Sequence, residues 1–592
     1  MHRPADAPRP SIYYPYKVHA PAPAHAQADV QVLVVGAGPI GLVTALGLAQ
    51  QGVRVAVLES ELQVSEGSRA IVFTRRSMEI LQQAGVAARV SAKGLPWRFG
   101  NSFYRGQRVF RMEAPHREGD RFFPMTNLQQ QFVEEYLLDA LAAFPNAQLR
   151  WGHKVLRLVD NVGDSADPGV TLEIDTPTGA YIQQAPWVVA ADGARSVLRA
   201  ACGLKLEGAA YEGRFVIADI RIDLPLPTER LAYFDPPWNP GNTVLMHREP
   251  DSIWRVDYQL PPGETPEQAL EPASLKARID AQLALIGHAG VPWELDWSSV
   301  YSARALTLPS YVHGRIAFAG DAAHLLPIFG VRGANTGFQD AQNLAWKLAA
   351  TVQGRAGPGL MDSYSHERVA AAREIVEEAG KSTRFMTPPT RGFRLLRDAV
   401  LSLSLTHDFV RPLYHWRTSR PHDYLDSPLN AADDDSAAFH AGPANGAPLP
   451  NYRWGEGFLL DHLCGQGAGC FSLIVDDPVT LATWGEEGAA GAQGRLGTLG
   501  TFGTPLNLAA LQTLVVPPSV GRALGLTGPS SALLVRPDQH VCARWLHVTP
   551  ARLQAALHQA LGHGLNRTLD HAPASLPAAP AQPSLSEPPC LA

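Results

Sequence analysis

The chain has 592 residues, with 50 Lys or Arg against 56 Asp or Glu and a formal net charge of −6. This length exceeds what one hydrophobic core supports, so at least two domains are expected, and a mildly acidic chain without a basic block is a poor partner for nucleic acid. No uncharged apolar run reaches about 18 residues, and the N-terminal segment lacks the apolar centre of an export signal, so the sequence predicts a cytoplasmic protein without a membrane partner.

The two ends of the chain, residues 1–28 and 572–592, are rich in Pro and Ala. Both are predicted to be disordered tails because they cannot bury enough apolar surface to offset the entropy of ordering. The five cysteines lack a CxxC pair or metal-type spacing, so neither a disulfide framework nor a metal site is predicted.

The first motif follows the N-terminal segment. Apolar residues 32–35 predict a buried strand, the sequence GAGPIG and a helix follow, and a second strand over residues 53–58 ends at Glu59. This βαβ pattern with a GxGxxG turn predicts dinucleotide binding. Gly36 permits the tight turn, Gly38 lets a pyrophosphate approach the helix start, and Gly41 permits close helix–strand packing. Glu59 can accept hydrogen bonds from a ribose diol, which fits the adenosine of NAD and of FAD equally well.

Two polar residues and a second motif come next. Arg69 can pair with a diphosphate, and Gln130, near the start of a helix predicted over residues 128–142, can reach a phosphate ester or a ribityl hydroxyl; for both, a surface role is the alternative. A buried strand over residues 187–191 then ends in an acid–glycine turn at Asp192, with Arg199 in the following helix. This pattern also suits an anion, although an acid–glycine pair alone indicates only a turn.

The third motif spans residues 314–349. A short strand stops at Gly320-Asp321, a loop containing Pro327 and Gly333 follows, and a helix begins near Asn335. A helix start after a glycine loop suits a phosphate or an electron-rich ring edge, and an ordinary strand–loop–helix connection is the alternative.

The three motifs, in this order, resemble the fingerprints of the single-component (class A) flavoprotein monooxygenases, which include phenol hydroxylase and 2-hydroxybiphenyl 3-monooxygenase. The resemblance covers residues 30–430. It implies an α/β protein with a Rossmann-type, glutathione-reductase-like FAD-binding domain, an inserted antiparallel-sheet substrate domain and a C-terminal thioredoxin-like domain.

Carried over by position, the resemblance makes Glu59 the ligand of the adenosine ribose. It places Arg69 and Gln130 at the FAD diphosphate and ribityl region, Asp192 and Arg199 in a shared FAD/NAD(P)H motif, and Asp321 at the ribityl chain. The other FAD contacts that it implies are Gly36, Gly38, Pro39, Gly41, Gly320, Pro327, Gly333, Ala334 and Asn335. The family often has proline, glycine and methionine where this chain has Ile328, Val331 and Ala334, so the surface beside the flavin differs and substrate size cannot be transferred.

Residues 243–260 are predicted to form a hairpin of an antiparallel sheet. Trp254, Val256 and Tyr258 share one face, expected to be core, and Arg255 and Asp257 share the other, expected to be mostly solvated. The resemblance implies that this sheet covers the flavin and shapes the substrate pocket. The pocket candidates for orienting or deprotonating a phenol are His247, Tyr258, Tyr233 and Asp257, with Pro327 from the flavin loop. Each alone is compatible with a structural role, and the catalytic base is not assigned. His324 is expected to stabilise a turn.

The expected domains are two FAD-binding parts (29–205 and 313–430), a substrate sheet (206–312), a linker (431–446) and a thioredoxin-like unit (447–571). Without a CxxC pair, the last unit should serve packing or dimerisation, so a homodimer is one assembly to consider. Arg536, Asp538 and His540 are interpreted as hairpin residues in this unit.

The function implied is an FAD-dependent monooxygenase that uses NAD(P)H and O2 and hydroxylates a phenolic or related aromatic substrate through a flavin C4a-hydroperoxide. Alternatives on the same fold are an oxidase or an epoxidase; a halogenase is disfavoured because the chain has no WxWxIP string. An FAD-bound interaction protein without turnover is a further alternative. A simple NAD-linked dehydrogenase would have no use for the second and third motifs.

Overall fold

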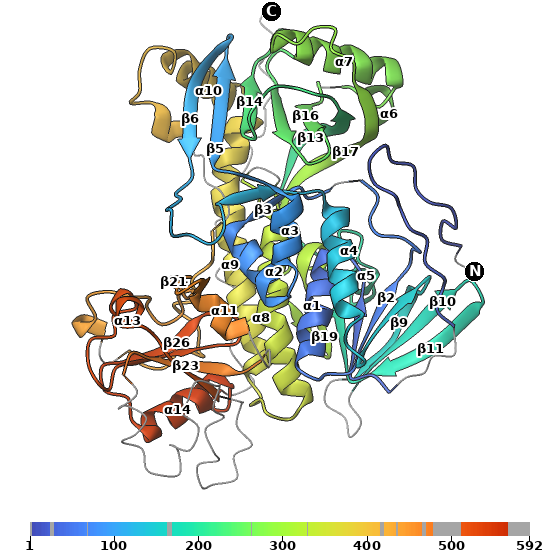
Figure 1. Cartoon of the computed structure of the whole chain (residues 1–592). Coiled ribbons are helices and arrows are strands. Elements are labelled where there is room, and N and C mark those ends of the chain that lie inside the picture. Colours follow the sequence, from blue (N-terminus) through green and yellow to red (C-terminus); the bar gives the residue numbers. More distant parts are fainter. Residues whose placement is uncertain are drawn as a thin grey trace, which may run out of the picture.

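The computed structural model describes residues 3–23, 29–67, 69–162, 169–261, 263–327, 330–414, 420–433, 436–464, 469–477 and 511–565. Figure 1 shows the motif-bearing sheet at the lower right, a large sheet above it and a C-terminal unit at the lower left. Among these residues, no helix combines the length and the apolar character needed to cross a bilayer.

The first sheet has six strands in the order β18-β19-β12-β1-β2-β8. Their bounds are β1 (Val32–Val35), β2 (Val55–Glu59), β8 (Ala147–Trp151), β12 (Trp187–Ala190), β18 (Val312–His313) and β19 (Ile316–Phe318). All neighbours from β19 to β8 are parallel, and β1 is buried along its whole length, as expected for a parallel strand covered on both faces. The three motif strands therefore end at one edge of one sheet.

Helices and a second small sheet complete this core. The helices are α1 (Pro39–Gln50), α4 (Gln130–Leu141) and α8 (Gly333–Val352), and the three-stranded antiparallel sheet consists of β9 (Lys154–Val162), β10 (Gly169–Thr176) and β11 (Gly179–Ala185). Leu172 and Ile174 of β10 join the same hydrophobic cluster as Leu46 of α1 and Phe338 of α8.

The second large sheet has eight strands in the order β20-β17-β13-β16-β15-β14-β5-β6. Their bounds are β5 (Phe99–Tyr104), β6 (Gln107–Glu113), β13 (Glu207–Arg221), β14 (Arg230–Phe234), β15 (Thr243–Arg248), β16 (Ile253–Gln259), β17 (Glu294–Thr307) and β20 (His324–Leu325). The sheet thus extends beyond the expected residues 206–312, because β5 pairs in parallel with β14 and β20 of the third motif pairs with β17.

The two faces of this sheet are both covered. The helices α6 (Pro266–Ala269) and α7 (Pro272–Leu285) lie over one face, where Ile279 and Leu283 pack against Val256 and Tyr258. The expectation that the opposite face is solvated is wrong, because Arg255 is 3% exposed and Asp257 is 7% exposed. This polar face is turned toward the first domain, where it needs internal partners or a ligand.

Shorter elements connect the two sheets. Strands β3 (Val72–Thr74), β7 (Met125–Asn127) and β4 (Leu95–Trp97) form a small sheet, and the helices near it are α2 (Arg75–Gln83) and α3 (Ala87–Lys93). The short helix α5 (Val197–Ala201) lies against β9 instead. The long helix α9 (Leu360–Met386) contributes to cores at both of its ends, and α10 (Arg391–Leu403) follows it.

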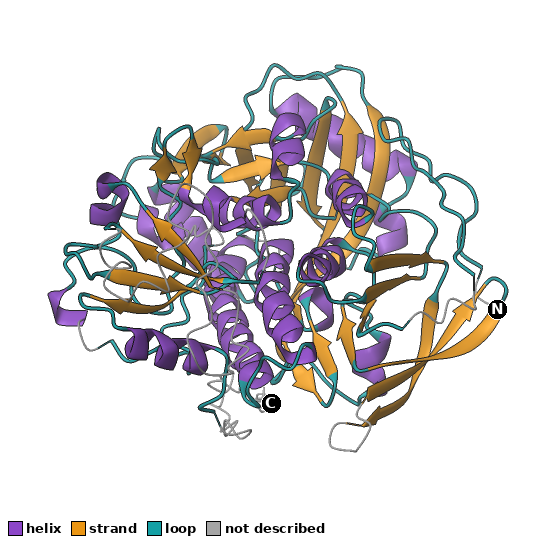
Figure 2. Cartoon of the chain, turned by 60° about the horizontal axis from the view of Figure 1, so that its bottom comes forward, coloured by secondary structure: helices purple, strands orange, loops and turns teal. Residues whose placement is uncertain are grey.

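The C-terminal unit has a four-stranded sheet in the order β24-β23-β25-β26, with helices in both of its hydrophobic clusters, the arrangement of a thioredoxin-like unit. Its elements are α11 (Leu459–Cys464), β23 (Phe471–Val475), β24 (Leu511–Val515), α13 (Pro518–Ala523), β25 (Ala532–Val535), β26 (Val541–Trp545) and α14 (Pro550–Ala560). Figure 2 shows long helices between this sheet and the other sheets. The expected tail at residues 572–592 lies outside the described residues.

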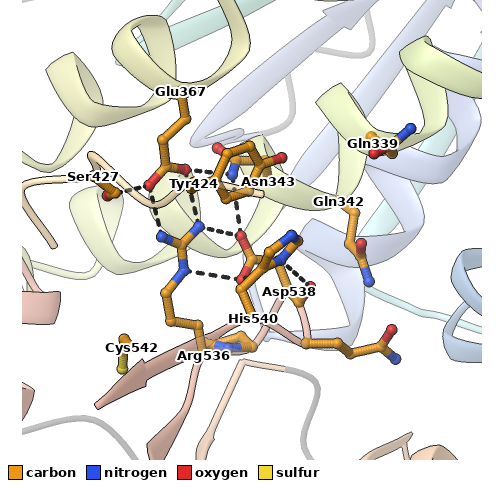
Figure 3. A network of polar contacts seen from close by, with 12 residues as sticks. Gln339, Gln342, Asn343, Glu367, Tyr424, Ser427, Arg536, Asp538, His540 and Cys542 are labelled. Carbon is orange, nitrogen blue, oxygen red and sulfur yellow. Dashed lines mark hydrogen bonds and ion pairs between the residues drawn. The ribbon is translucent and has the colours of Figure 1, made fainter. Parts of the chain in front are cut away.

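The polar residues of the β25–β26 hairpin join this unit to the first domain (Figure 3). Arg536 donates to both carboxylate oxygens of Glu367 on α9, at 2.6 and 2.9 Å, and also pairs with Asp538. Lys347 of α8 donates to Glu367 at 2.7 Å, and Asn343 donates to both Glu367 and Asp538. These hairpin residues therefore form a buried ionic junction between the two units.

The N-terminal segment is packed, so the expectation of a disordered tail is wrong for residues 3–23. Tyr14 and Tyr16 are 6% and 8% exposed, and the ring of Tyr14 meets Phe132 edge-on at a centroid distance of 5.0 Å. Tyrosine supplies apolar surface and a hydroxyl that can be satisfied, which offsets the Pro/Ala composition around it. We call residues 9–22 the strap (Figure 1, dark blue beside the N label).

Candidate active site

The glycine-rich turn between β1 and α1 has the geometry that its spacing predicted. Gly36 has a φ of +103°, and a Cβ there would lie 2.4 Å from the carbonyl oxygen of Ala191. A Cβ at Gly41 would lie 2.0 Å from the carbonyl oxygen of Gly36. The packing of the protein itself therefore requires glycine at both positions.

Gly38 differs from these two glycines. Its φ is −69°, which any residue adopts, and a Cβ there would meet no atom of the described chain within 4 Å. Pro39 follows at the start of α1, where its missing N–H costs no hydrogen bond. No described part of the protein demands glycine at position 38, so the space at this helix start is open to a ligand such as a phosphate.

Glu59 lies at the end of β2 beside this turn. One carboxylate oxygen accepts the N–H of Ala37 at 2.8 Å, and the other accepts the N–H of Glu61 at 2.9 Å. The carboxylate is thus fixed between the glycine turn and the following loop, in a position where it can accept further hydrogen bonds.

Gln130 fixes the loop that carries Arg69. Its side-chain carbonyl accepts the N–H of Ala70 at 3.1 Å, and its amide group donates to Glu134 at 2.8 Å. Arg69 is exposed and lies on the wall of the cavity described below. Gln130 therefore supports the loop, and Arg69 lies on the cavity wall.

The second motif braces the third. Asp192 accepts the N–H of Leu198 at 3.3 Å, close to the start of α5. The guanidinium of Arg199 donates to the carbonyl oxygens of Asp321 and Ala322, at 3.3 and 3.0 Å. Arg199 thus holds the backbone of the Asp321 turn.

Asp340 of α8 is the centre of the third motif, and sequence reasoning missed it. One of its oxygens accepts the Gly320 N–H at 3.1 Å and contacts the ring nitrogen Nε2 of His324 at 2.6 Å, while the other accepts from Arg368 at 2.7 Å. Burial acts to raise the pKa of Asp340, but His324 and Arg368 outweigh it and hold the pKa below its ordinary value. The turn that exposes Asp321 is thereby pinned at both ends, which agrees with the structural role expected for His324.

Asn335 braces the loop before α8. Its side-chain carbonyl accepts the N–H of Thr74 and the hydroxyl of Ser77, and its amide group donates to the carbonyl oxygens of Val72 and Val331. Val331 has a φ of +61°, a left-handed conformation that is strained for a β-branched residue. Asn335 is therefore occupied within the protein, and the first turn of α8 exposes Gly333 and Ala334 on the wall of the same cavity.

This cavity, of about 160 Å3, lies between the loops of the first domain and the polar face of the eight-stranded sheet. A volume of about 150 Å3 is enough for a benzene ring. The residues on the first side are Arg69, Ala70, Ile71, Val72, Leu326 and Val331 to Asn335, and those on the sheet side are Ile217, Arg230, Leu245, His247, Arg255, Asp257 and Tyr301.

The sheet side presents buried polar atoms. Among the described residues, none forms a hydrogen bond with Nδ1 of His247, Oδ1 of Asp257 or the hydroxyl of Tyr301. Arg255, in contrast, donates to both oxygens of Asp219 at 2.8 Å. Buried polar atoms without a partner are costly, so this face is suited to a polar ligand.

Burial sets the protonation states of these groups. Burial raises the pKa of Asp257 to about 7, with Arg255 opposing the shift. Burial also lowers the pKa of His247 well below its ordinary value, assisted by Arg230, so the ring is neutral. Burial raises the pKa of Tyr301 well above its ordinary value, so this hydroxyl stays protonated. The cavity thus combines a carboxyl group that titrates near neutrality with a phenolic donor.

The structure separates the other candidates from this site. Tyr258 is in the core on the opposite face of the sheet, edge-on to Trp238 at 5.6 Å, and Tyr233 stacks on Phe103 at 4.8 Å. Pro327 is buried directly after the cavity residue Leu326, and Ile328 lies outside the described residues.

Two further cavity residues, Arg230 and Tyr301, were missed from the sequence. The alternation of side chains along β14 and β17 indicates which residues share a face of the sheet. It does not indicate which face meets the loops of the first domain.

Comparisons with known proteins agree with this arrangement. The family described as FAD binding domain matches residues 29–379. The chain is 29% identical over 449 residues to a 3-(3-hydroxy-phenyl)propionate/3-hydroxycinnamic acid hydroxylase of Mycobacterium sp. (strain JLS), which covers 76% of each protein. The flavin-dependent monooxygenase PieE, solved with FAD and substrate, is similar with a TM-score of 0.71 and 24% identity over 90% of this chain and 99% of that one. Aklavinone-11 hydroxylase, solved with FAD and aklavinone, has a TM-score of 0.69 and 25% identity over 90% and 99% of the two chains.

Proposed function

The chain belongs to the FAD binding domain family and is an FAD-dependent aromatic hydroxylase, and on this premise we propose that its substrate is a phenol carrying a carboxylate, bound in the cavity beside Asp257. When bound, FAD supplies hydride acceptance from NAD(P)H and activation of O2. The residues fit this cofactor, since Gly38 leaves open space at a helix start and Glu59 stands at the end of the neighbouring strand. Arg69 and the exposed Asp321 would hold its more distal parts.

The observation that supports a phenol is the set of unpaired atoms on His247, Asp257 and Tyr301. Asp257, with its pKa near 7, accepts the phenolic proton, and the protonated Tyr301 donates a hydrogen bond toward the resulting oxyanion. A phenolate ring is richer in electrons than a phenol, so deprotonation favours oxygen transfer to the ring. The buried surroundings also exclude water from the reacting groups.

The charge of the cavity supports the carboxylate. Arg69, Arg230, Arg255 and Arg332 line its wall, and Asp257 is the one acid among the described residues that line it. Guanidinium groups bind carboxylates in paired hydrogen bonds, so an anionic side chain on the substrate complements this excess. The Mycobacterium relative is named as a hydroxylase of such phenolic acids.

The test is to load the protein with FAD and compare 3-hydroxyphenylpropionate with its neutral amide and with unsubstituted phenol. The proposal expects stimulated NAD(P)H oxidation, O2 uptake and a hydroxylated product, with KM lowest for the acid. Arg230→Met should raise KM for the acid and leave KM for the amide unchanged. Equal KM for acid and amide would defeat the anionic substrate. O2 consumption without a hydroxylated product would favour an oxidase, and bound FAD without NAD(P)H consumption would favour an interaction protein.

A further inference from the structure

The strap lies against the loop of residues 61–67, which runs from the ribose-side acid Glu59 toward Arg69. The backbone N–H of Arg9 donates to Gln63 at 2.9 Å, and its guanidinium donates to the carbonyl oxygen of Val64 at 2.5 Å. The hydroxyl of Tyr16 accepts the N–H of Gly67 at 3.1 Å and donates to the carbonyl oxygen of Ser65 at 3.2 Å. The backbone N–H of His19 also donates to the carbonyl oxygen of Leu62. Arg9, Tyr16 and His19 thus contact this loop along its length.

The same strap is tied to the eight-stranded sheet. The hydroxyl of Ser11 and the N–H of Ile12 both donate to one carboxylate oxygen of Asp296 on β17, each at 2.7 Å. The residue after Asp296 closes the loop from the other side, because a Cβ at Gly67 would lie 2.2 Å from the ring of Trp297. Gly67 is therefore held between the Tyr16 hydroxyl and the Trp297 ring.

We propose that the strap is a positioning element of the flavin site, with Tyr16 as its principal residue. It fixes the 61–67 loop between the first domain and the sheet, and so holds Arg69, two residues beyond Gly67, at the cavity wall. The strap lies before residue 29, where the family match begins. This inference rests on the proposed function only in taking FAD as the ligand of the cleft.

The hydroxyls of Tyr16 and Tyr14 offer a matched pair of variants. The hydroxyl of Tyr14 donates to Glu135 on α4 at 3.1 Å and not to the described residues of the loop, so Tyr14→Phe removes an equivalent hydroxyl from the same strap. We expect Tyr16→Phe to raise the Kd for FAD by about 3- to 10-fold, the worth of one or two hydrogen bonds, and Tyr14→Phe to leave it unchanged. Deletion of residues 2–23 should weaken FAD binding further, and a peptide of residues 3–23 added in trans should restore part of the affinity.

Hydrogen exchange separates positioning from a general loss of stability. The Gly67 amide depends on Tyr16, whereas the Ser65 amide is held by Glu134 at 2.7 Å. In the FAD-free protein, Tyr16→Phe should accelerate exchange at Gly67 and leave Ser65 protected. If Tyr16→Phe and Tyr14→Phe have the same FAD Kd and the same Gly67 exchange, or if Ser65 and Gly67 accelerate equally, the proposal is wrong. None of these measurements requires turnover, so an absence of hydroxylated product from the wild type would defeat the proposed function alone.

Discussion

The side chains of Asp340 and His324 lie 2.6 Å apart with no solvent exposure of either, and together they fix the turn that presents Asp321. The carboxylate also balances the buried Arg368. Removing one member of such a buried set leaves the others charged without compensation.

Asp340→Asn is therefore expected to lower the free energy of unfolding by about 3–5 kcal/mol and to weaken FAD binding. Asp139→Asn is the matched control, because Asp139 pairs with Arg89 at the surface, where such a pair contributes about 0–1 kcal/mol. Urea unfolding and FAD titration measure both effects. Equal losses in the two variants would contradict the central role of Asp340.

Gly38 and Gly41 should respond differently to the same change. Gly41→Ala places a Cβ 2.0 Å from the Gly36 carbonyl oxygen, so this variant is expected to lose the folded first domain. The Cβ of Gly38→Ala meets no atom of the described residues within 4 Å, so this variant should keep its unfolding temperature without cofactor while losing FAD affinity by at least about tenfold. Thermal unfolding with and without FAD distinguishes the two variants. Unchanged FAD affinity of Gly38→Ala would mean that no phosphate binds beside Gly38.

The Arg536 junction is expected to hold the C-terminal unit in place. Arg536→Met leaves Glu367 and Asp538 buried with too little positive charge, so about 3–5 kcal/mol of stability should be lost. Arg552→Met is the control, because Arg552 of α14 in the same unit donates to the carbonyl oxygen of His547, outside residues 431–446, and its loss should cost about 1 kcal/mol or less. Limited proteolysis should then cut Arg536→Met faster than Arg552→Met within residues 431–446. Equal cleavage rates would mean that the junction does not join the units.

Val331 tests whether the flavin-side loop stores strain. Its φ of +61° suits glycine, so Val331→Gly should be neutral or stabilising by about 1 kcal/mol. Val72→Gly is the control, because Val72 lines the same cavity within β3 and should cost about 2 kcal/mol or more. The unfolding temperatures of the two variants test this prediction. A destabilised Val331→Gly would show that packing of the isopropyl group contributes more to stability than the strain costs.

Part of this site could be predicted from the sequence, because the residues that determine it are close together in the chain. The positions of Gly36, Gly41 and Glu59 follow from a strand–turn–helix pattern whose constraints lie within a few residues. Asp340 could not be read in the same way, because its partners Gly320, His324 and Arg368 meet it only when the turn, α8 and α9 are packed together.

Long-range packing also explains the two wrong expectations. The strap looks disordered by composition, and its order depends on Gln63, Gly67 and Asp296, which are distant in sequence. The face of Arg255 and Asp257 alternates like a solvated strand face, and only its position against the loops of the first domain makes it a cavity wall.

Asp257 is predicted to set the pH dependence of kcat. Its carboxyl group must be ionised to accept a phenolic proton, so kcat should rise with pH through about 7. Its ordinary pKa is near 3.9, so between these values the folded protein binds more protons than the unfolded chain, and Asp257 costs stability increasingly as the pH rises. Asp257→Asn should thus lower kcat by about 100-fold or more, and raise the unfolding temperature at pH 8 but not at pH 4.

Asp223→Asn is the control for this last prediction, because Asp223 is exposed just beyond β13. It should change neither the pH profile of kcat nor the unfolding temperature at either pH. If Asp257→Asn keeps the rise of kcat near pH 7, another group deprotonates the substrate. If Asp257→Asn loses activity but its unfolding temperature at pH 8 does not rise, ionising the buried carboxyl group costs the fold no stability. The raised pKa of Asp257 would then be wrong.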